Sequence, residues 1–139
     1  MEFTEKKGNL FNERSSLAHC VSLDFEMSAG IALTFKQKYG GIVELKQQKR
    51  KVGECSILQR DDKFIFYLIT KERYFHKPTL ENLRKSLEYL RELCSTYDVT
   101  NLSMPRIGCG MDNLDWDAVR DTIKDVFKNT DINITICSM

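Results

Sequence analysis

Two short glycine-containing stretches hold residue types that are suited to bind a phosphate or to do chemistry. The first is "DFEMSAG", residues 24–30, and the second is "PRIGCGMD", residues 105–112. Each precedes a segment with helical spacing, and a helix N-terminus offers unpaired N–H groups and partial positive charge. Glycine lets the backbone approach an anion closely, so the two stretches together could hold a diphosphate. Walker and dinucleotide-binding patterns are absent, and an ordinary connecting role for both loops stays open.

Four reactive side chains lie in or near these stretches, and each also has a structural interpretation. Lys71 ends the apolar run "FIFYLIT", where a strand would deliver it to a site, but a solvated lysine fits the same pattern. Asp112 could move a proton or cap the following helix. Cys109 could be a nucleophile or a small residue that fills a tight loop. His19 lies in an apolar strand and fits a satisfied core histidine better than a base.

The spacing of apolar residues predicts the elements that position these side chains. Apolar runs and alternation predict strands, and steps of three and four predict helices. The expected strands cover residues 16–23, the two arms of a hairpin within 55–70, 101–104 and 132–136, and the expected helices cover 31–39, 78–94 and 116–127. Such alternation predicts an α/β fold, a mixed sheet with helices on both faces. Ligands bind such sheets at the carboxyl ends of strands, where both glycine stretches and Lys71 fall.

Length and composition predict one ordinary globular domain, residues 1–139. The chain is 42% hydrophobic and 29% charged, and its formal net charge is +1. These totals give no indication of a nucleic-acid-binding or membrane-binding protein. The basic run "KQQKRK", residues 46–51, is interpreted as a solvated helix end and loop rather than as a binding patch.

Cysteine usage indicates a reducing compartment. The five cysteines are odd in number and form no C-x-x-C pair, so neither a disulfide framework nor a zinc site is expected. No N-terminal apolar run resembles a signal peptide, and no apolar run reaches the ~18 residues of a membrane span. We therefore expect no membrane association.

Several motifs occur in order along nearly the whole chain, from about Phe3 to the C-terminus. They are "GNLF", "SLAHCVS", "MSAGIALTFKQKYGG", "YLITK", "HKPTLENLRKSLE" and "MPRIGCGMD". Together they resemble the macrodomain family, and most closely its terminal ADP-ribose protein glycohydrolase branch, also described as O-acyl-ADP-ribose deacylase. The resemblance implies a three-layer α/β/α macrodomain with a mixed central sheet and a cleft for ADP-ribose. It implies no metal and no cofactor.

The resemblance also implies an activity and two catalytic residues. This branch removes mono-ADP-ribose that is ester-linked to Glu or Asp side chains of proteins, and it deacylates O-acyl-ADP-ribose. Its catalytic lysine follows the "YLIT" strand and maps to Lys71, and its catalytic aspartate follows the glycine loop and maps to Asp112. An uncharged lysine amine can attack the distal ribose carbon and form a Schiff-base-type intermediate, while a neighbouring carboxylate shuttles protons.

The ligand-binding residues that the resemblance implies lie near the N-terminus and in the two glycine stretches. They are Asn9, Leu10, Ser22, Ser28, Ala29, Gly30, Ile31, Pro105, Ile107, Gly108, Cys109, Gly110 and Met111. Two of them depart from the family pattern. Asn9 stands where the family usually has Asp, so the hydrogen bond to the adenine amino group loses its charge assistance. Ser28 stands where close relatives tend to have Gly, and its side chain either crowds the ligand or adds a hydroxyl contact.

The leading hypothesis is therefore an ADP-ribosyl hydrolase. The alternative is a non-catalytic module that binds ADP-ribose, and a third hypothesis is an interaction protein on a decayed macrodomain scaffold, against which the intact loops count. The expected partners are ADP-ribose and ADP-ribosylated proteins, and the cluster Lys46, Lys49, Arg50 and Lys51 adds ADP-ribosylated nucleic acid as a secondary hypothesis. We expect a monomer that occupies nucleus and cytoplasm.

Overall fold

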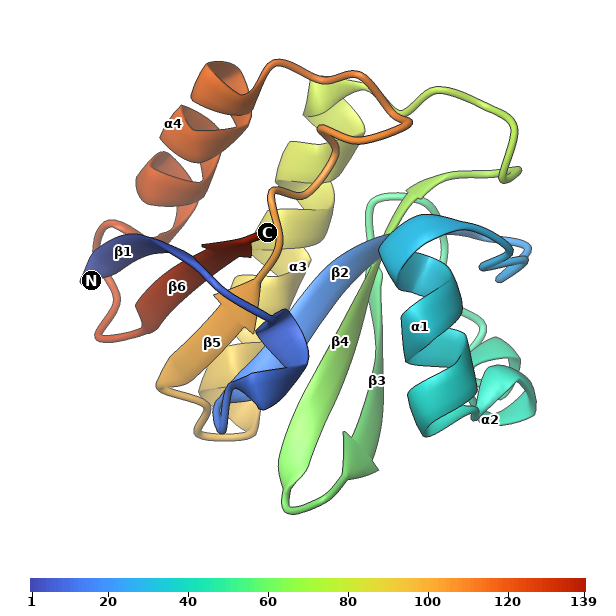
Figure 1. The fold of residues 1–139 in the computed structure, drawn as a ribbon, viewed down its shortest axis with the longest axis horizontal. Helices are drawn as coiled ribbons and strands as arrows, with labels where there is room; N and C mark the ends of the chain where they lie inside the picture. The colour runs from blue at the N-terminus through green and yellow to red at the C-terminus, as the bar shows by residue number, and fades with distance from the viewer.

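Six strands form one mixed sheet in the computed structural model, which describes residues 1–139 (Figure 1). The strands are β1 (Phe3–Lys7), β2 (Ser16–Ser22), β3 (Cys55–Arg60), β4 (Lys63–Lys71), β5 (Asn101–Met104) and β6 (Asn133–Ser138). Their order across the sheet is β1-β6-β5-β2-β4-β3. The β3–β4 hairpin is antiparallel and every other neighbouring pair is parallel, which confirms the predicted mixed sheet.

Helices cover both faces of this sheet. They are α1 (Gly30–Tyr39), α2 (Ile42–Gln47), α3 (Leu80–Thr96) and α4 (Trp116–Phe127), and a 3₁₀ turn covers Leu10–Asn12. The central strand β4 is buried on both sides because its residues alternate between two cores. Phe66 and Leu68 pack in the core that includes α3 and α4, whereas Ile65, Tyr67 and Ile69 pack in the core that includes α1 and α2. This arrangement confirms the predicted three-layer α/β/α architecture.

The predicted starts and stops of the elements have clear physical causes. The Thr79 hydroxyl accepts a hydrogen bond of 3.1 Å from the Asn82 N–H and caps α3. Gly40 ends α1 with φ +59°, a conformation that only glycine adopts without strain. The hairpin turns at Asp61 and Asp62, whose φ values are 52° and 63°. All three features fit the predicted ranges of these elements.

Three elements were not predicted. Strand β1 is an edge strand, and four of its five residues are exposed, so it lacks the apolar alternation that marks a strand. Helix α2 is six residues long, too short to show a helical period, and the 3₁₀ turn is shorter still. The basic run that begins at Lys46 does form the end of α2 and the following loop, as predicted. None of the helices combines the length and apolarity that crossing a bilayer requires.

One edge of the sheet collects the loops that hold or adjoin most of the predicted site residues. Strands β2, β4 and β5 are mutually parallel, so their carboxyl ends lie at the same edge. The β2–α1 loop, the β4–α3 loop and the β5–α4 loop all leave the sheet there, as the blue, yellow-green and orange segments of Figure 1 show. Side chains at these strand ends and loops can therefore act together.

Candidate active site

Lys71 and Asp112 meet at this carboxyl edge. Lys71 is the last residue of β4, and its Nζ lies 2.6 Å from Oδ1 of Asp112 in the β5–α4 loop. The two side chains retain only 14% and 18% of their accessible surface. A charged pair that is partly withdrawn from water interacts more strongly than an exposed pair. The arrangement places an amine and a proton acceptor within direct transfer distance.

Asp112 does not cap helix α4. That role belongs to Asp115, whose Oδ2 accepts a 3.1 Å hydrogen bond from the N–H of Ala118 in the first turn. The helix-capping interpretation of Asp112 is therefore wrong, and its carboxylate is directed at Lys71 instead.

Glycine has a defined structural role in the β5–α4 loop. Gly108 has φ +73°, and a Cβ atom there would lie 2.9 Å from Cδ1 of Leu114. The Gly108 carbonyl accepts a 2.7 Å hydrogen bond from the N–H of Leu114, which folds the loop back on itself. Gly110 is exposed, and a Cβ atom there would meet no heavy atom within 4 Å, so this glycine leaves open space beside the backbone. Only the first of these two glycines is required by the fold of the loop.

The other predicted residues of this loop differ in what they can offer a ligand. Ile107 is 2% exposed and belongs to the core, so only its backbone groups can reach a ligand. Pro105 and Cys109 are half-buried, and Met111 is exposed. The Cys109 thiol donates to the carbonyl of Ile107 at 3.3 Å, and burial raises its pKa. A neutral thiol bonded within its own loop fits the space-filling interpretation of Cys109.

The β2–α1 loop ends at an uncapped helix. Ser28, Ala29, Gly30 and Ile31 are all exposed, and Ala29 is the N-cap residue of α1, where no side chain bonds the first turn. Helices α3 and α4 both have such a bond. The first N–H groups of α1 are therefore free to meet an anion, and the +60° φ of Gly30 sets their direction.

Two buried residues fix the shape of the same loop. Phe25 and Met27 have φ values of 50° and 46°, a region that bulky residues rarely occupy. Each is only 4% exposed, and both pack in the core below α1. Burial of these side chains stabilises a backbone conformation that is otherwise unfavourable, so the loop is held in one shape.

Asp24 organises the site and was not predicted. Its Oδ1 accepts from the Ser22 hydroxyl and from the N–H of Glu26, and its Oδ2 accepts from the N–H of Tyr74 at 3.1 Å. Burial opposes ionisation, but these hydrogen bonds outweigh it and lower the pKa of the Asp24 carboxyl. The aspartate thereby ties the β2–α1 loop to the β4–α3 loop. An aspartate that bonds the N–H two residues on is a recognisable turn signal, and it could have been found from the sequence.

Ser22 is the last residue of β2, and Asn9 and Leu10 follow β1. Ser22 is 4% exposed, and it pairs with Lys71 across a register irregularity between β2 and β4. Asn9 follows the carboxyl end of β1, is exposed, and accepts a 3.0 Å hydrogen bond from the Phe11 N–H through its Oδ1. Leu10 is 4% exposed and packs in the core. Its side chain is thus structural.

His19 lies in the core, as predicted, but it is not a satisfied histidine. Its ring is fully buried and stacks on Phe35 with centroids 3.7 Å apart. Neither ring nitrogen has a hydrogen-bond partner. Burial lowers the pKa of His19 to about 3, so the ring is neutral at physiological pH. The prediction was right about the location and wrong about the hydrogen bonding.

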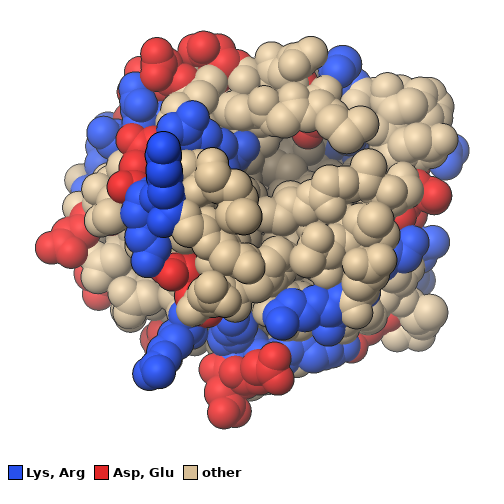
Figure 2. Space-filling view, in the orientation of Figure 1, with Lys and Arg blue, Asp and Glu red and all other residues tan.

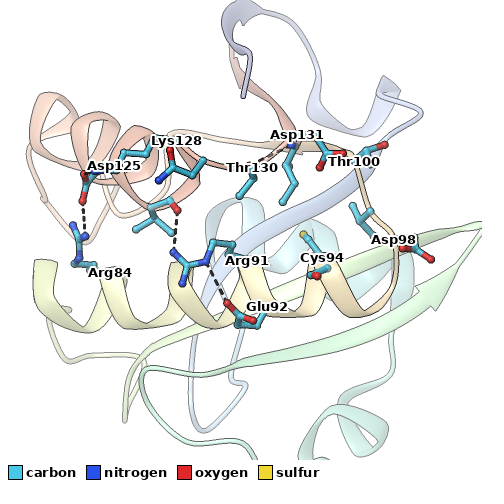
Figure 3. A pocket seen from close by; sticks show the side chains of 15 residues that line it. Arg84, Arg91, Glu92, Cys94, Asp98, Thr100, Asp125, Lys128, Thr130 and Asp131 are labelled. Atoms are coloured by element: carbon cyan, nitrogen blue, oxygen red, sulfur yellow. Dashed lines mark hydrogen bonds and ion pairs between the residues drawn. The ribbon is translucent and has the colours of Figure 1, made fainter.

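A hollow opens on the face that carries the three loops. Figure 2 shows it bordered mostly by residues other than Lys, Arg, Asp and Glu, in the region where Figure 1 has the start of α1 and the β5–α4 loop. A different groove, of about 870 Å³, lies between α3 and α4 (Figure 3). None of the predicted site residues lines that groove, and its arginines are paired, Arg84 with Asp125 and Arg91 with Glu92. We therefore assign the site to the Lys71–Asp112 edge.

Known proteins resemble this chain over most of its length. Residues 9–123 match the Macro domain family. The chain is 53% identical over 138 residues to the ADP-ribose glycohydrolase OARD1 of Homo sapiens and to that of Bos taurus, which covers 98% of this chain and 91% of each relative. The fold also matches Thermosipho africanus DarTG in complex with ADP-ribose, with TM-score 0.87 and 18% identity, over 98% of this chain and 41% of that one. The chain belongs to the Macro domain family.

Proposed function

We propose that this protein is an ADP-ribosyl hydrolase that releases mono-ADP-ribose from esters with Glu and Asp side chains of proteins, and that it also deacylates O-acyl-ADP-ribose. The observation that carries the proposal is the 2.6 Å contact between Lys71 Nζ and Asp112 Oδ1. Relatives at 53% identity are named ADP-ribose glycohydrolase, which supports hydrolysis of an ADP-ribosyl bond. A module that only binds ADP-ribose needs no amine and carboxylate in transfer distance.

The hollow at the Lys71–Asp112 edge, which we call the cleft, supplies the features that a diphosphate ligand requires. The uncapped N-terminus of α1 and the backbone of the β5–α4 loop offer N–H groups at one edge of the sheet. An anion there would gain hydrogen bonds from both loops and the favourable field of a helix N-terminus. The related DarTG structure contains ADP-ribose, which supports the same ligand here. Asn9 is proposed to accept a hydrogen bond from the adenine amino group.

Lys71 and Asp112 then carry out the chemistry in two stages. In the first, Asp112 takes a proton from Lys71, and the free amine attacks the distal ribose carbon that holds the ester. The bond from this carbon to the ester oxygen breaks, and the protein carboxylate leaves with the electron pair. The nitrogen of the new C–N bond loses one proton to water, and the proton on Asp112 passes to the ring oxygen. The ring therefore opens to a protonated imine between Lys71 and the ribose, and Asp112 is again a carboxylate.

In the second stage, water adds to the imine carbon and the amine of Lys71 departs. Asp112 accepts the proton of the attacking water and returns a proton to the leaving amine. The products are free ADP-ribose and an unmodified carboxyl side chain, so no other reactant is consumed. A carboxylate is a good leaving group because its conjugate acid has a pKa of ~4.3. The chemistry therefore favours ester-linked substrates over ADP-ribose on a serine hydroxyl.

The experiment that tests this function compares two linkages. The protein is incubated with a Glu-linked ADP-ribosylated protein and with a Ser-linked one, and mass spectrometry follows released ADP-ribose and the restored side chain. We expect release from the Glu-linked substrate and little from the Ser-linked substrate. Binding of ADP-ribose without release from either substrate would instead support a module that only binds ADP-ribose.

A further inference from the structure

Three large apolar side chains stand in solvent beside the Lys71–Asp112 pair. Tyr74 is 54% exposed, Phe75 68% and Met111 76%. We call these three residues the apolar rim. Isolated apolar residues are common on protein surfaces, but a group of them next to a reactive pair indicates an interaction site. None of the three belongs to either buried core.

Chain connectivity alone keeps the apolar rim near the reacting atoms. Met111 precedes Asp112 directly, and consecutive Cα atoms are ~3.8 Å apart. Tyr74 follows Lys71 by three positions, and three extended residues span at most ~10 Å. The rim therefore lies beside the bond that the proposed reaction breaks, on two loops that flank it.

Hydrogen bonds between the loops hold the rim in place. Lys77 Nζ donates to the carbonyl of Met111 at 2.6 Å, which joins the β4–α3 loop to the β5–α4 loop. The N–H of Tyr74 donates to Asp24, which joins it to the β2–α1 loop. The rings of Tyr74 and Phe75 pack edge to face, with centroids 5.4 Å apart and an interplanar angle of 87°. An exposed surface that is ordered in advance binds a partner with less loss of entropy.

We propose that the apolar rim docks the polypeptide that carries the ADP-ribosyl group, and that it makes a protein ester a better substrate than a small one. The inference rests on the proposed function. When ADP-ribose occupies the cleft, its ester lies at Lys71, and the polypeptide extends from that point across the exposed side of the site. The β4–α3 and β5–α4 loops form this side. Residues that flank the modified Glu or Asp meet Tyr74 and Phe75 through apolar contacts.

The charges near the rim favour a polypeptide over a nucleic acid. Phosphate backbones are bound by several free Lys and Arg side chains. Here the Lys77 amine is bonded to a backbone carbonyl, and the Arg106 guanidinium lies over the Trp116 ring. Arg73 is the exposed cation next to the two rings, and a single arginine is fewer than a phosphate backbone requires. Aromatic rings without a basic groove are suited to apolar side chains of a peptide.

The test uses two substrates with the same ester bond. One is a Glu-linked ADP-ribosylated protein, and the other is the ADP-ribose ester of an isolated glutamate. The double variant Tyr74→Ala/Phe75→Ala should lower kcat/KM on the protein substrate about tenfold and leave kcat/KM on the small ester unchanged, since hot-spot aromatics dominate such contacts. Val43→Ala removes an apolar side chain on α2 that is 69% exposed, close to the 68% of Phe75, and should affect neither substrate. The small ester also reports whether each variant is folded.

Each other outcome overturns the proposal. Equal losses on both substrates would place the two rings against ADP-ribose itself, and no loss on either would leave the rim without a partner. With an ADP-ribosylated oligonucleotide assayed as a third substrate, a loss on that substrate alone would assign the rim to nucleic acid. Failure of the unmodified protein to cleave either ester would instead refute the proposed function, and the docking role with it.

Discussion

Lys71 and Asp112 are 41 positions apart in the sequence, yet their Nζ and Oδ1 atoms lie 2.6 Å apart at the carboxyl edge of the sheet. Two structural facts bring them together. Strand β4 ends at Lys71, and Asp115 caps helix α4, so Asp112 lies three residues before the N-cap and outside the helix. The carboxylate that pairs with Lys71 therefore comes from the β5–α4 loop and not from helix α4.

The first prediction separates the roles of the two aspartates. Asp112→Ala should slow turnover by ~10²-fold or more, because proton transfer is lost, while the melting temperature changes little. Asp115→Ala should leave turnover unchanged and lower stability by ~1 kcal/mol, the usual value of an N-cap. Kinetics and urea unfolding on both variants check this. Full activity of Asp112→Ala would contradict the proton-shuttle role.

The second prediction concerns Asn9. Asn9→Asp should tighten ADP-ribose binding by about 1 kcal/mol, roughly fivefold, since a charged acceptor strengthens the hydrogen bond to the adenine amino group. The local bond from the Phe11 N–H survives the change because Asp retains an acceptor oxygen. Calorimetry with ADP-ribose measures the difference. Unchanged or weaker affinity would show that Asn9 does not meet the adenine.

A third prediction distinguishes the two glycines of the β5–α4 loop. Gly108→Ala should destabilise the protein by ~1–2 kcal/mol, because alanine is strained at positive φ, and its Cβ would also crowd Leu114. Gly110→Ala should have little effect on stability, because its Cβ would meet nothing within 4 Å. Urea unfolding of the two variants tests this. Equal stability of both would contradict the assigned role of Gly108.

The fourth prediction follows from the buried ring of His19. Its folded-state pKa is lowered from 6.5 to about 3, so below pH 6.5 the unfolded chain binds a proton that the fold excludes. The contribution of His19 to the free energy of unfolding is fully present above pH 6.5, and it is lost as the pH falls toward 3. Between pH 7 and pH 5 the loss amounts to about 2 kcal/mol.

Two variants isolate this contribution. His19→Leu should lose about 2 kcal/mol less stability than the unmodified protein when the pH is lowered from 7 to 5. His76→Leu is the matched control, because His76 is exposed, and its pH dependence should equal that of the unmodified protein. Free energies of unfolding from urea titrations at both pH values provide the measurement. Identical pH dependence in all three proteins would refute the explanation.

Much of the fold was predictable because its signals are local. The apolar steps along α3, the cap at Thr79 and the uninterrupted apolar run of β4 each specify an element without reference to the rest of the chain. Strand β1 was missed because its exposed "FTEKK" pattern carries no such signal, and it forms by pairing with β6 at the far end of the chain.

The candidate site was predictable in part. Sequence placed Lys71 and both glycine loops at strand ends, but the choice between a shuttle and a cap for Asp112 depended on which aspartate starts α4. The turn that Asp24 forms with the N–H of Glu26 has a local signal, but its bond to the N–H of Tyr74, 50 positions away, has none. The missing hydrogen bonds of His19 likewise follow from tertiary packing against Phe35.

The most direct test of the central claim is reductive trapping of the imine on Lys71. The protein is held with ADP-ribose, treated with borohydride, digested and analysed by mass spectrometry, and Lys71→Arg is assayed in parallel. Arginine retains the charge but stays protonated, so it cannot attack a carbon. We predict an ADP-ribose adduct on the peptide that contains Lys71, together with loss of hydrolysis in Lys71→Arg. Release of ADP-ribose by Lys71→Arg at the unmodified rate would contradict the account.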